Sequence, residues 1–114
     1  MVNYLYVCEV FNIINRKAIN SYAMDYPDAA KALREWYHVL RLSSHTNWNE
    51  LKAEFPSASL VGDDRVVFNV LGTKYRLVVR VVFAFRVVQV KWFGTHADYD
   101  RVDVNLIQPK NKNT

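Results

Sequence analysis

A histidine and a tyrosine lie three residues apart in Gly94-Thr-His-Ala-Asp-Tyr-Asp100, shortly after a run of arginines and lysines. Histidine has an unperturbed pKa of about 6.5 and can transfer a proton near neutral pH. Arginine stabilises negative charge on a phosphate group. A ribonuclease that works without a metal needs this pairing, and His96 and Arg76 are the candidates for it. From spacing alone, a surface histidine at the end of a short helix is the more ordinary interpretation of His96.

The charges of the chain are unevenly distributed. Its net charge is +4, and the whole excess lies in residues 55–114, because acidic and basic side chains cancel in residues 1–54. No Asp or Glu occurs between Arg65 and Ala97, whereas this stretch contains Arg65, Lys74, Arg76, Arg80, Arg86, Lys91 and His96. A segment in which every charged side chain is positive favours an anionic partner. The alternative is a solvated strand face whose lysines and arginines protect a sheet edge.

Other kinds of site have weaker support. The three histidines are scattered, and neither Asp63-Asp64 nor the pair Asp98 and Asp100 is clustered like a metal-ligand set, so we expect no metal. The chain has no phosphate-binding glycine loop and no Ser-His-Asp signature, and we expect no cofactor. Cys8 is the single cysteine, which favours a reducing compartment, and it reads as a small buried hydrophobic residue.

The first half of the chain reads as one strand followed by helices. We expect a strand over residues 10–14 and a helix from about residue 16 to 26 that Asn15 caps. Pro27 ends this helix and starts a second one from Asp28 to about Leu42, since proline and an acidic residue suit a first helical turn. Helical spacing predicts the buried faces: Ile19, Tyr22, Ala23 and Tyr26, then Ala29, Leu33, Trp36, Tyr37 and Leu40.

The second half is expected to be an antiparallel β-meander. Strands over residues 65–70 and 73–82 are joined by Leu71-Gly72 as a two-residue turn, so that 69 faces 74, 67 faces 76 and 65 faces 78. A second reversal near Ala84-Phe85 pairs 80 with 89, 78 with 91 and 76 with 93. Gly94 then lets the chain turn off the sheet beside Arg76, the predicted partner of Phe93.

The pleat of these strands separates apolar from basic side chains. The apolar face, which we expect the helices to cover, holds Val66, Phe68, Val70, Tyr75, Leu77, Val79, Val81, Val88, Val90 and Trp92. The opposite face holds Arg65, Asn69, Lys74, Arg76, Arg80, Gln89 and Lys91, with Val67, Val78 and Phe93 among them. Cations on a pleated surface can follow phosphates while aromatic neighbours support bases, which favours RNA or a single strand. The expected RNA-binding residues are Arg65, Asn69, Lys74, Arg80 and Lys91.

Four segments resemble the HigB family of bacterial type II toxins: Phe55-Pro-Ser-Ala-Ser59, Asp64-Arg-Val-Val-Phe-Asn-Val70, Gly72-Thr-Lys-Tyr-Arg-Leu-Val-Val79 and Gly94-Thr-His-Ala-Asp-Tyr-Asp100. The helical half agrees, with Tyr26-Pro-Asp-Ala29, Leu33, Trp36-Tyr37 and Trp48 in the expected order. The resemblance runs from about Phe11 to Asp103. The chain departs from the family at Thr73, where asparagine is expected, and in Met1–Val7, which precede the expected start as an added strand or a misassigned start.

The resemblance implies a RelE-like α+β fold, an antiparallel β-meander packed on N-terminal helices, and ribosome-dependent cleavage of mRNA without metal or cofactor. In this reaction the ribose 2′-hydroxyl attacks the adjacent phosphate in line and the 5′-oxygen leaves. Arg76 would stabilise the phosphate, His96 would be the general acid, and Tyr99 would orient the RNA or stack on a base. Lys74 and Arg65 would bind phosphates, or one of them would stabilise the attacking oxygen. The general base is left open.

The resemblance also implies a partner, a HigA-type helix-turn-helix antitoxin encoded beside the toxin, and binding of operator DNA only as the toxin-antitoxin complex. Two other functions remain possible on the same scaffold. One is inhibition of DNA gyrase, as in ParE-like relatives, which lack the catalytic set, so His96 and Tyr99 argue against it. The other is a plain RNA-binding module that does not cut.

We expect a single domain over residues 1–107 and a polar tail over residues 108–114. No secretory signal is evident. The longest apolar stretch, residues 77–90, is interrupted by two arginines and a glutamine, whereas a membrane span needs about 20 residues with few charges. These features predict a soluble, cytoplasmic protein without membrane contact.

Overall fold

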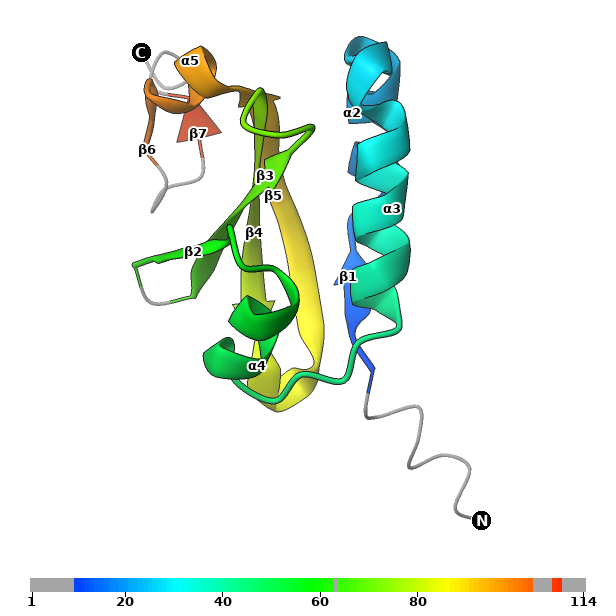
Figure 1. Ribbon diagram of the computed structural model, residues 1–114, viewed down its shortest axis with the longest axis vertical. Coiled ribbons are helices and arrows are strands. Elements are labelled where there is room, and N and C mark those ends of the chain that lie inside the picture. Colours follow the sequence, from blue (N-terminus) through cyan, green and yellow to red (C-terminus); the bar gives the residue numbers. More distant parts are fainter. Residues whose placement is uncertain (1–9, 63, 104–107, 110–114) are drawn as a thin grey trace.

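The computed structural model describes residues 10–62, 64–103 and 108–109. Its elements follow the chain (Figure 1) in the order β1 (Asn12–Ile14), α2 (Arg16–Asp25), η1 (Pro27–Ala29), α3 (Ala30–Arg41), α4 (Trp48–Glu54), β2 (Ser59–Val61), β3 (Arg65–Val70), β4 (Tyr75–Val82), η2 (Phe83–Phe85), β5 (Val87–Thr95), α5 (His96–Tyr99), β6 (Val102–Asp103) and β7 (Gln108–Pro109). The labels η1 and η2 denote short 3-10 helices. Within the described residues, no helix is long and apolar enough to cross a membrane.

Five strands form one sheet in the order β1-β5-β4-β3-β2. The strands β3, β4 and β5 are the predicted antiparallel meander, and the α+β class is confirmed. The sheet is larger than expected and mixed, because β2 pairs antiparallel with β3 at one edge and β1 pairs parallel with β5 at the other. Sequence analysis missed β2 because three residues are too few to show an alternating pattern.

The strands β6 and β7 form a separate two-stranded pair, so the first two residues of the expected tail, Gln108 and Pro109, are paired as a strand. The rest of that tail, residues 110–114, lies outside the described residues. Two other predictions fall outside them as well: the burial of Cys8 and the added strand at Met1–Val7.

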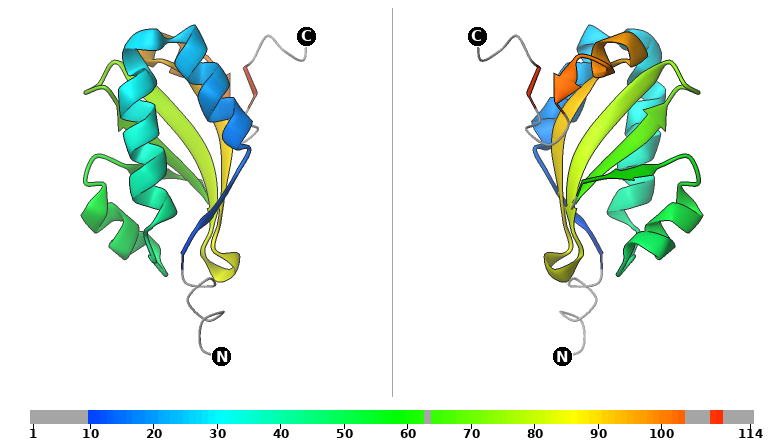
Figure 2. Two further views of the ribbon diagram at one scale, coloured as in Figure 1. Left: turned by 90° about the vertical axis from the view of Figure 1, so that its right-hand side faces the viewer. Right: turned by 90° about the vertical axis from the view of Figure 1, so that its left-hand side faces the viewer.

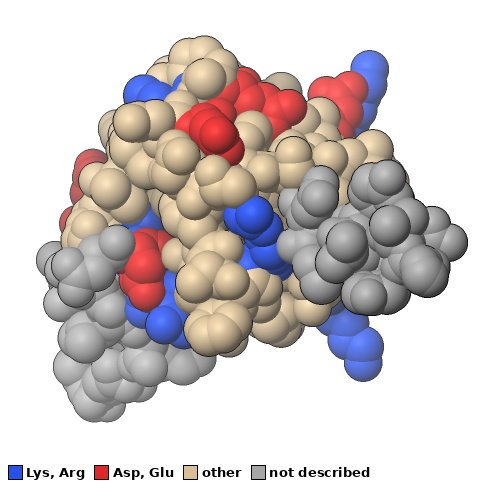
Figure 3. Space-filling view, turned by 90° about the horizontal axis from the view of Figure 1, so that it is seen from below, with Lys and Arg blue, Asp and Glu red and all other residues tan. Residues whose placement is uncertain are grey.

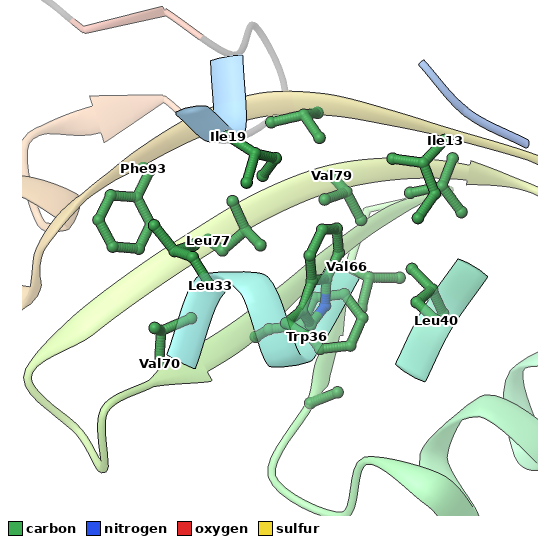
Figure 4. Packing of buried hydrophobic residues seen from close by; sticks show 14 of the residues in the cluster. Ile13, Ile19, Leu33, Trp36, Leu40, Val66, Val70, Leu77, Val79 and Phe93 are labelled. Carbon is green, nitrogen blue, oxygen red and sulfur yellow. The ribbon is translucent and has the colours of Figure 1, made fainter. Parts of the chain in front are cut away.

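The helices α2 and α3 cover one face of the five-stranded sheet, and α5 lies on its other side (Figures 1 and 2). The predicted helical stripes are confirmed. Their buried members are Ile19, Ala23, Ala29, Leu33, Trp36 and Leu40, with Tyr22, Tyr26 and Tyr37 packed against them. Side chains of α3 such as Leu33 and Trp36 meet those of the strands, such as Leu77 and Val79 (Figure 4). The helices α2 and α3 therefore do not cover the opposite face of the sheet, on whose side α5 lies.

The predicted start of α2 after Asn15 and the predicted break at Pro27 are both confirmed, but the side chain of Asn15 does not make the predicted bond. Pro27 separates the two helices and opens η1, as expected. Asn15 stands at the N-cap of α2 in a left-handed conformation, φ 74°, without capping the helix through its side chain. Its Nδ2 atom donates instead to the carbonyl of Val90 in β5, at 3.4 Å. The predicted capping bond is therefore wrong, because this side chain connects α2 to the sheet.

The hairpin between β3 and β4 has a longer loop than predicted. Val70 pairs with Tyr75, Asn69 with Arg76 and Arg65 with Arg80, so each partner lies two residues further along than expected. The loop spans residues 71–74, and Leu71 (φ 57°) and Gly72 (φ 65°) both adopt left-handed conformations. A shift of two residues preserves which face each side chain occupies. The predicted two-residue turn is wrong, and the predicted separation of faces in these two strands is right.

A β-bulge changes the second half of β5. The predicted pair of Arg80 with Gln89 is confirmed, but Val79 pairs with Val90 while Val78 pairs with Trp92, which leaves Lys91 without an opposite residue. An extra residue turns all later side chains to the other face. Phe93 therefore lies in the core (5% exposed; Figure 4), and Trp92 lies on the outer face, the reverse of the prediction.

The aromatic core explains why Phe93 takes the inner position. Its ring is stacked on that of Tyr75, with ring centroids 5.2 Å apart, and lies 5.4 Å from the rings of Tyr22 and Tyr26. Aromatic pairs at such distances stabilise a core beyond the area that they bury. The contact of Phe93 with three aromatic side chains, from α2, its C-terminal end and β4, is a tertiary preference, which the local strand pattern does not contain.

Candidate active site

The end of β5 and the start of α5 carry His96 to a position next to Arg76. Arg76 of β4 pairs with Gly94, and Tyr75 pairs with Thr95. The backbone N–H of His96 donates to the carbonyl of Lys74 at 3.1 Å, which extends the ladder by one more step. Thr95 then caps α5, since its hydroxyl accepts from the N–H of Asp98 at 3.1 Å. His96 is thus the first residue of α5 and is exposed to solvent.

Arg76 is held near this strand end by the hairpin loop. Its Nη1 atom donates to the carbonyl of Thr73 at 3.0 Å, and the residue is partly buried. Its predicted cross-strand partner, Phe93, is replaced by Gly94 because of the bulge. On the other side Arg76 pairs with Asn69, so this predicted RNA-binding residue also belongs to the same end of the sheet.

Tyr99 and Trp92 form an aromatic pair beside Arg76. Their ring centroids are 6.2 Å apart, and both residues are partly exposed. Burial raises the pKa of the Tyr99 hydroxyl, while the nearby positive charge of Arg76 opposes that rise. Tyr99 therefore stays neutral at ordinary pH and can donate a hydrogen bond or stack. Trp92 was not predicted to belong to this site, because it was expected on the inner face.

Gly94 makes room for the Trp92 ring, and this is the signal by which Trp92 could have been found. A Cβ atom on Gly94 would lie 2.7 Å from both Cη2 and Cζ2 of Trp92, closer than any carbon contact allows. Residues two apart in a strand share a face, so a glycine two positions after a tryptophan can mark a ring that lies flat on the strand. The predicted role of Gly94 as the point where the chain leaves the sheet is wrong, because it stays paired within β5.

Lys74 does not lie on the outer strand face. Its Nζ atom contacts Oδ2 of Asp28 at 2.5 Å, and the hydroxyl of Tyr75 donates to Oδ1 of the same carboxylate at 2.8 Å. The hydrogen bond from Lys74, followed by that from Tyr75, lowers the pKa of Asp28. The same bond to Asp28 raises the pKa of Lys74. Lys74 therefore remains protonated, and it connects the hairpin loop to the helical layer.

Arg65 and Arg80 occupy the other end of the predicted basic face. They are cross-strand partners, and both contact Asp64: Arg65 Nη1 at 2.7 Å and Arg80 Nε at 2.6 Å. The bond from Arg80 is the main reason why the pKa of Asp64 is lowered. Along β4, Arg80 stands four residues from Arg76, or about 13 Å at the usual rise of a strand.

The expected continuous basic face is therefore divided. Val67 and Val78, which pair with each other between the two ends, are both buried. The end near α5 combines Asn69, Arg76 and His96 with the aromatic pair, whereas the other end holds Arg65 and Arg80 on Asp64. Figure 3 shows the end of the molecule away from α5, where acidic and basic side chains are intermingled. The candidate active site is the end near α5.

The other two histidines, His38 and His45, lie outside the candidate active site. His45 contacts Glu54 at 2.7 Å, and its ring packs near Phe11. Among the residues that the structure describes, no group of three or more His, Cys, Asp or Glu side chains could hold a metal ion. His38 lies exposed on α3.

Comparison with known proteins agrees with this geometry. A family model described as HigB toxin, the RelE-like toxic component of a toxin-antitoxin system, matches residues 29–102. The match covers α3, the whole meander and α5, and so includes Arg76, Trp92, His96 and Tyr99. No curated protein matches the chain. Toxins of this kind act with an antitoxin partner. The chain belongs to the HigB toxin family of RelE-like toxins.

Proposed function

We propose that this toxin is a ribosome-dependent mRNA endonuclease that works without a metal and inhibits translation. The observation that carries the proposal is the pairing at the end of β4 and β5. It brings the backbones of Arg76 and His96 to within two steps of each other on one ladder, and the rings of Tyr99 and Trp92 form a pair beside them. A charge-stabilising group, a proton donor and a surface for bases are the parts that such a cleavage needs.

In the proposed reaction, the 2′-oxygen of a ribose forms a bond to the adjacent phosphorus and the bond from phosphorus to the 5′-oxygen breaks. The guanidinium group of Arg76 stabilises the charge that develops on the phosphate oxygens. His96 gives a proton to the departing 5′-oxygen. The proton of the attacking hydroxyl passes to solvent. The products are a 2′,3′-cyclic phosphate and a 5′-hydroxyl end, so atoms and charges balance.

The side chains around this pair support binding rather than proton abstraction. Lys74 leaves the expected RNA-binding set, because its protonated Nζ atom is bound to Asp28 of the helical layer and its charge is paired there. Tyr99 holds its proton because burial raises its pKa. We assign base stacking to Tyr99 together with Trp92, which the structure adds to the expected set. Asn69 and Lys91 extend the RNA-binding surface, and Arg65 and Arg80 contribute a second cationic position.

The partners proposed for this activity are the mRNA, the ribosome and a HigA-type helix-turn-helix antitoxin. Operator DNA is bound only through the complex of toxin and antitoxin. A neighbouring reading frame that encodes a small helix-turn-helix protein would support this assignment.

The direct test compares the wild type with His96→Ala and Arg76→Ala by expression in growing cells and mapping of transcript ends. We expect each variant to lose cleavage and toxicity by about 10²- to 10⁴-fold, the usual contribution of a general acid or a charge stabiliser. Arg101→Ala is the matched control, since Arg101 is an exposed arginine outside the site with one weak contact, 3.8 Å to Asp98. Thermal unfolding confirms that each variant is folded.

Two outcomes would reject the proposal. Undiminished cleavage in both His96→Ala and Arg76→Ala would show that these residues are not the site. Intact transcripts together with arrested replication in cells that express the wild type would favour a gyrase inhibitor on the same scaffold.

A further inference from the structure

The first half of the chain is electrically balanced in sequence, but folding separates its charges. Three of its carboxylates, although exposed, accept hydrogen bonds within the molecule: Asp28 from Lys74 and Tyr75, Glu50 from Thr46, and Glu54 from Ser43 and His45. The bond from the backbone of Thr46 is the main cause that lowers the pKa of Glu50. The described partners of these three acids are thus residues outside α3.

The cations of α3 have no such partners. Lys31, Arg34, His38 and Arg41, which we call the α3 stripe, follow each other at intervals of three, four and three residues. This spacing places them on one side of the helix over an axial length of about 15 Å. All four are exposed, and no ion pair joins any of them to a carboxylate in the described part of the chain. Glu35 is the one acidic residue of α3.

A groove between the two helices continues the stripe. It has a volume of about 150 Å³, and it is lined by Arg16, Ile19, Asn20, Arg34, Tyr37 and His38. The guanidinium group of Arg16 lies over the ring of Tyr37, 5.5 Å from its centroid. Such a contact holds an arginine in place while its N–H groups stay available to an anion. The helical layer therefore presents three fixed or aligned arginines, a lysine and a histidine together.

We propose that the α3 stripe and Arg16 form a second RNA-binding surface, which binds the phosphate backbone of folded RNA. The surface consists of Arg16, Lys31, Arg34 and Arg41, with His38 between Arg34 and Arg41. Protein interfaces are depleted of charged residues at their centre, whereas interfaces with nucleic acids are strongly positive. Arginines along a helix can contact successive phosphates, each through paired hydrogen bonds. RNA therefore fits this surface better than an acidic protein does.

The position of the surface determines which RNA it meets. The buried residues of α3 face the sheet, and α5 with the candidate active site lies on the other side of that sheet (Figures 1 and 2). One RNA strand in the active site cannot also lie along the α3 stripe. The inference rests on the proposed function in one respect: a ribosome offers both an mRNA for the site and folded RNA around it. The toxin would then contact RNA on two opposite sides.

The test measures binding to purified bacterial ribosomes as a function of salt concentration. The double variant Arg34→Gln/Arg41→Gln removes two charges from the stripe, and Lys52→Gln/Arg101→Gln removes two exposed charges elsewhere as the matched control. All proteins carry His96→Ala, so that cleavage does not change the ribosome complex. Thermal unfolding checks that both double variants are folded.

We expect the stripe variant to bind about ten- to thirty-fold more weakly near 100 mM salt, because two phosphate contacts are lost. The slope of log affinity against log salt should fall by about 1.5, since each phosphate contact contributes about 0.7 to 0.9. The control should retain the slope of the parent protein.

Equal affinity and slope in the stripe variant and the control would overturn the proposal. Unchanged ribosome binding together with loss of a co-expressed antitoxin would also overturn it, and would assign the stripe to the protein partner. Neither result depends on cleavage, so the two proposals can fail separately. The proposed function fails if His96→Ala and Arg76→Ala keep cleaving, whatever the α3 stripe binds.

Discussion

Gly94 shows how closely the Trp92 ring approaches the backbone of β5. A Cβ atom at this position would lie 2.7 Å from two ring atoms, although the φ of Gly94 is outside the left-handed region. The glycine is therefore needed for space and not for backbone conformation. The Trp92 ring can take its place beside Tyr99 only because residue 94 has no Cβ atom.

The Gly94→Ala substitution tests this reading. We expect the free energy of unfolding to fall by about 1–3 kcal/mol, the usual cost of overpacking, because the Trp92 ring must move. In a Trp92→Ala background the same substitution should cost much less, since its clash is gone. Urea unfolding of the four proteins in this cycle measures the coupling. An equal cost in both backgrounds would show that the ring is not what Gly94 accommodates.

At the scale of single residues, the predicted neighbourhood of Arg76 and His96 agrees with the structure, whereas the predicted face of Trp92 is wrong. The backbones of Arg76 and His96 lie at one end of the sheet, and their catalytic roles stay predictions. Trp92 was placed on the inner face because alternation was extended through the bulge at Lys91. Strict alternation describes a regular strand, and an extra residue leaves no mark in a run of apolar side chains.

At the scale of elements, Asp28 connects the start of the helical layer to the hairpin that carries Arg76. The carboxylate binds Lys74 and Tyr75, which follow it in the chain by 46 and 47 residues. An acidic residue was expected here for the helix dipole, but its hydrogen bonds are made to the loop and to β4. The link holds Lys74, whose carbonyl accepts from His96, against the helices.

The Asp28→Asn substitution should lower the melting temperature by a few degrees near pH 7. The folded pKa of Asp28 is below its usual value, so the unfolded chain binds more protons and this contribution to stability rises with pH. It is complete above the ordinary carboxyl pKa of about 3.9 and is lost as the pH falls through the lower folded value. The gap to wild type should therefore narrow as the pH falls below about 4. Thermal melts across this range measure it.

Asp25→Asn is the control for this prediction. Asp25 is the exposed last residue of α2, and none of the described contacts involves its side chain. Its substitution should leave the melting temperature nearly unchanged at every pH. A gap between Asp28→Asn and wild type that persists at pH 2 would show that the contact is not between charged groups.

At the scale of the whole molecule, one core between the sheet and a single helical layer stabilises the fold. Leu33 on α3 and Leu77 on β4 are both fully buried in it. The face of the sheet that bears α5 and the outward face of α3 remain for binding. This arrangement places the candidate active site and the α3 stripe on opposite sides of the core.

Leu77→Ala should lower the free energy of unfolding by about 2–5 kcal/mol, since it removes a buried side chain from the central strand of the core. Leu42→Ala is the matched control: Leu42 is 69% exposed, and we expect a change within about 0.5 kcal/mol. Urea unfolding measures both. Similar values for the two variants would contradict the position of the core between α3 and β4.

The sequence by itself determined the main helices, the strands of the meander, and the faces of the helices and of β3 and β4, and it supplied the candidates for catalysis. These features follow from periodicity and local motifs, which act over a few neighbouring positions. Only the tertiary structure decided the parallel pairing of β1 with β5, the exchange of Trp92 and Phe93, the binding of Lys74 by Asp28, and the separation of charge that leaves the α3 stripe exposed. Each of these depends on groups far apart in the chain, whose contacts are established only when the layers pack.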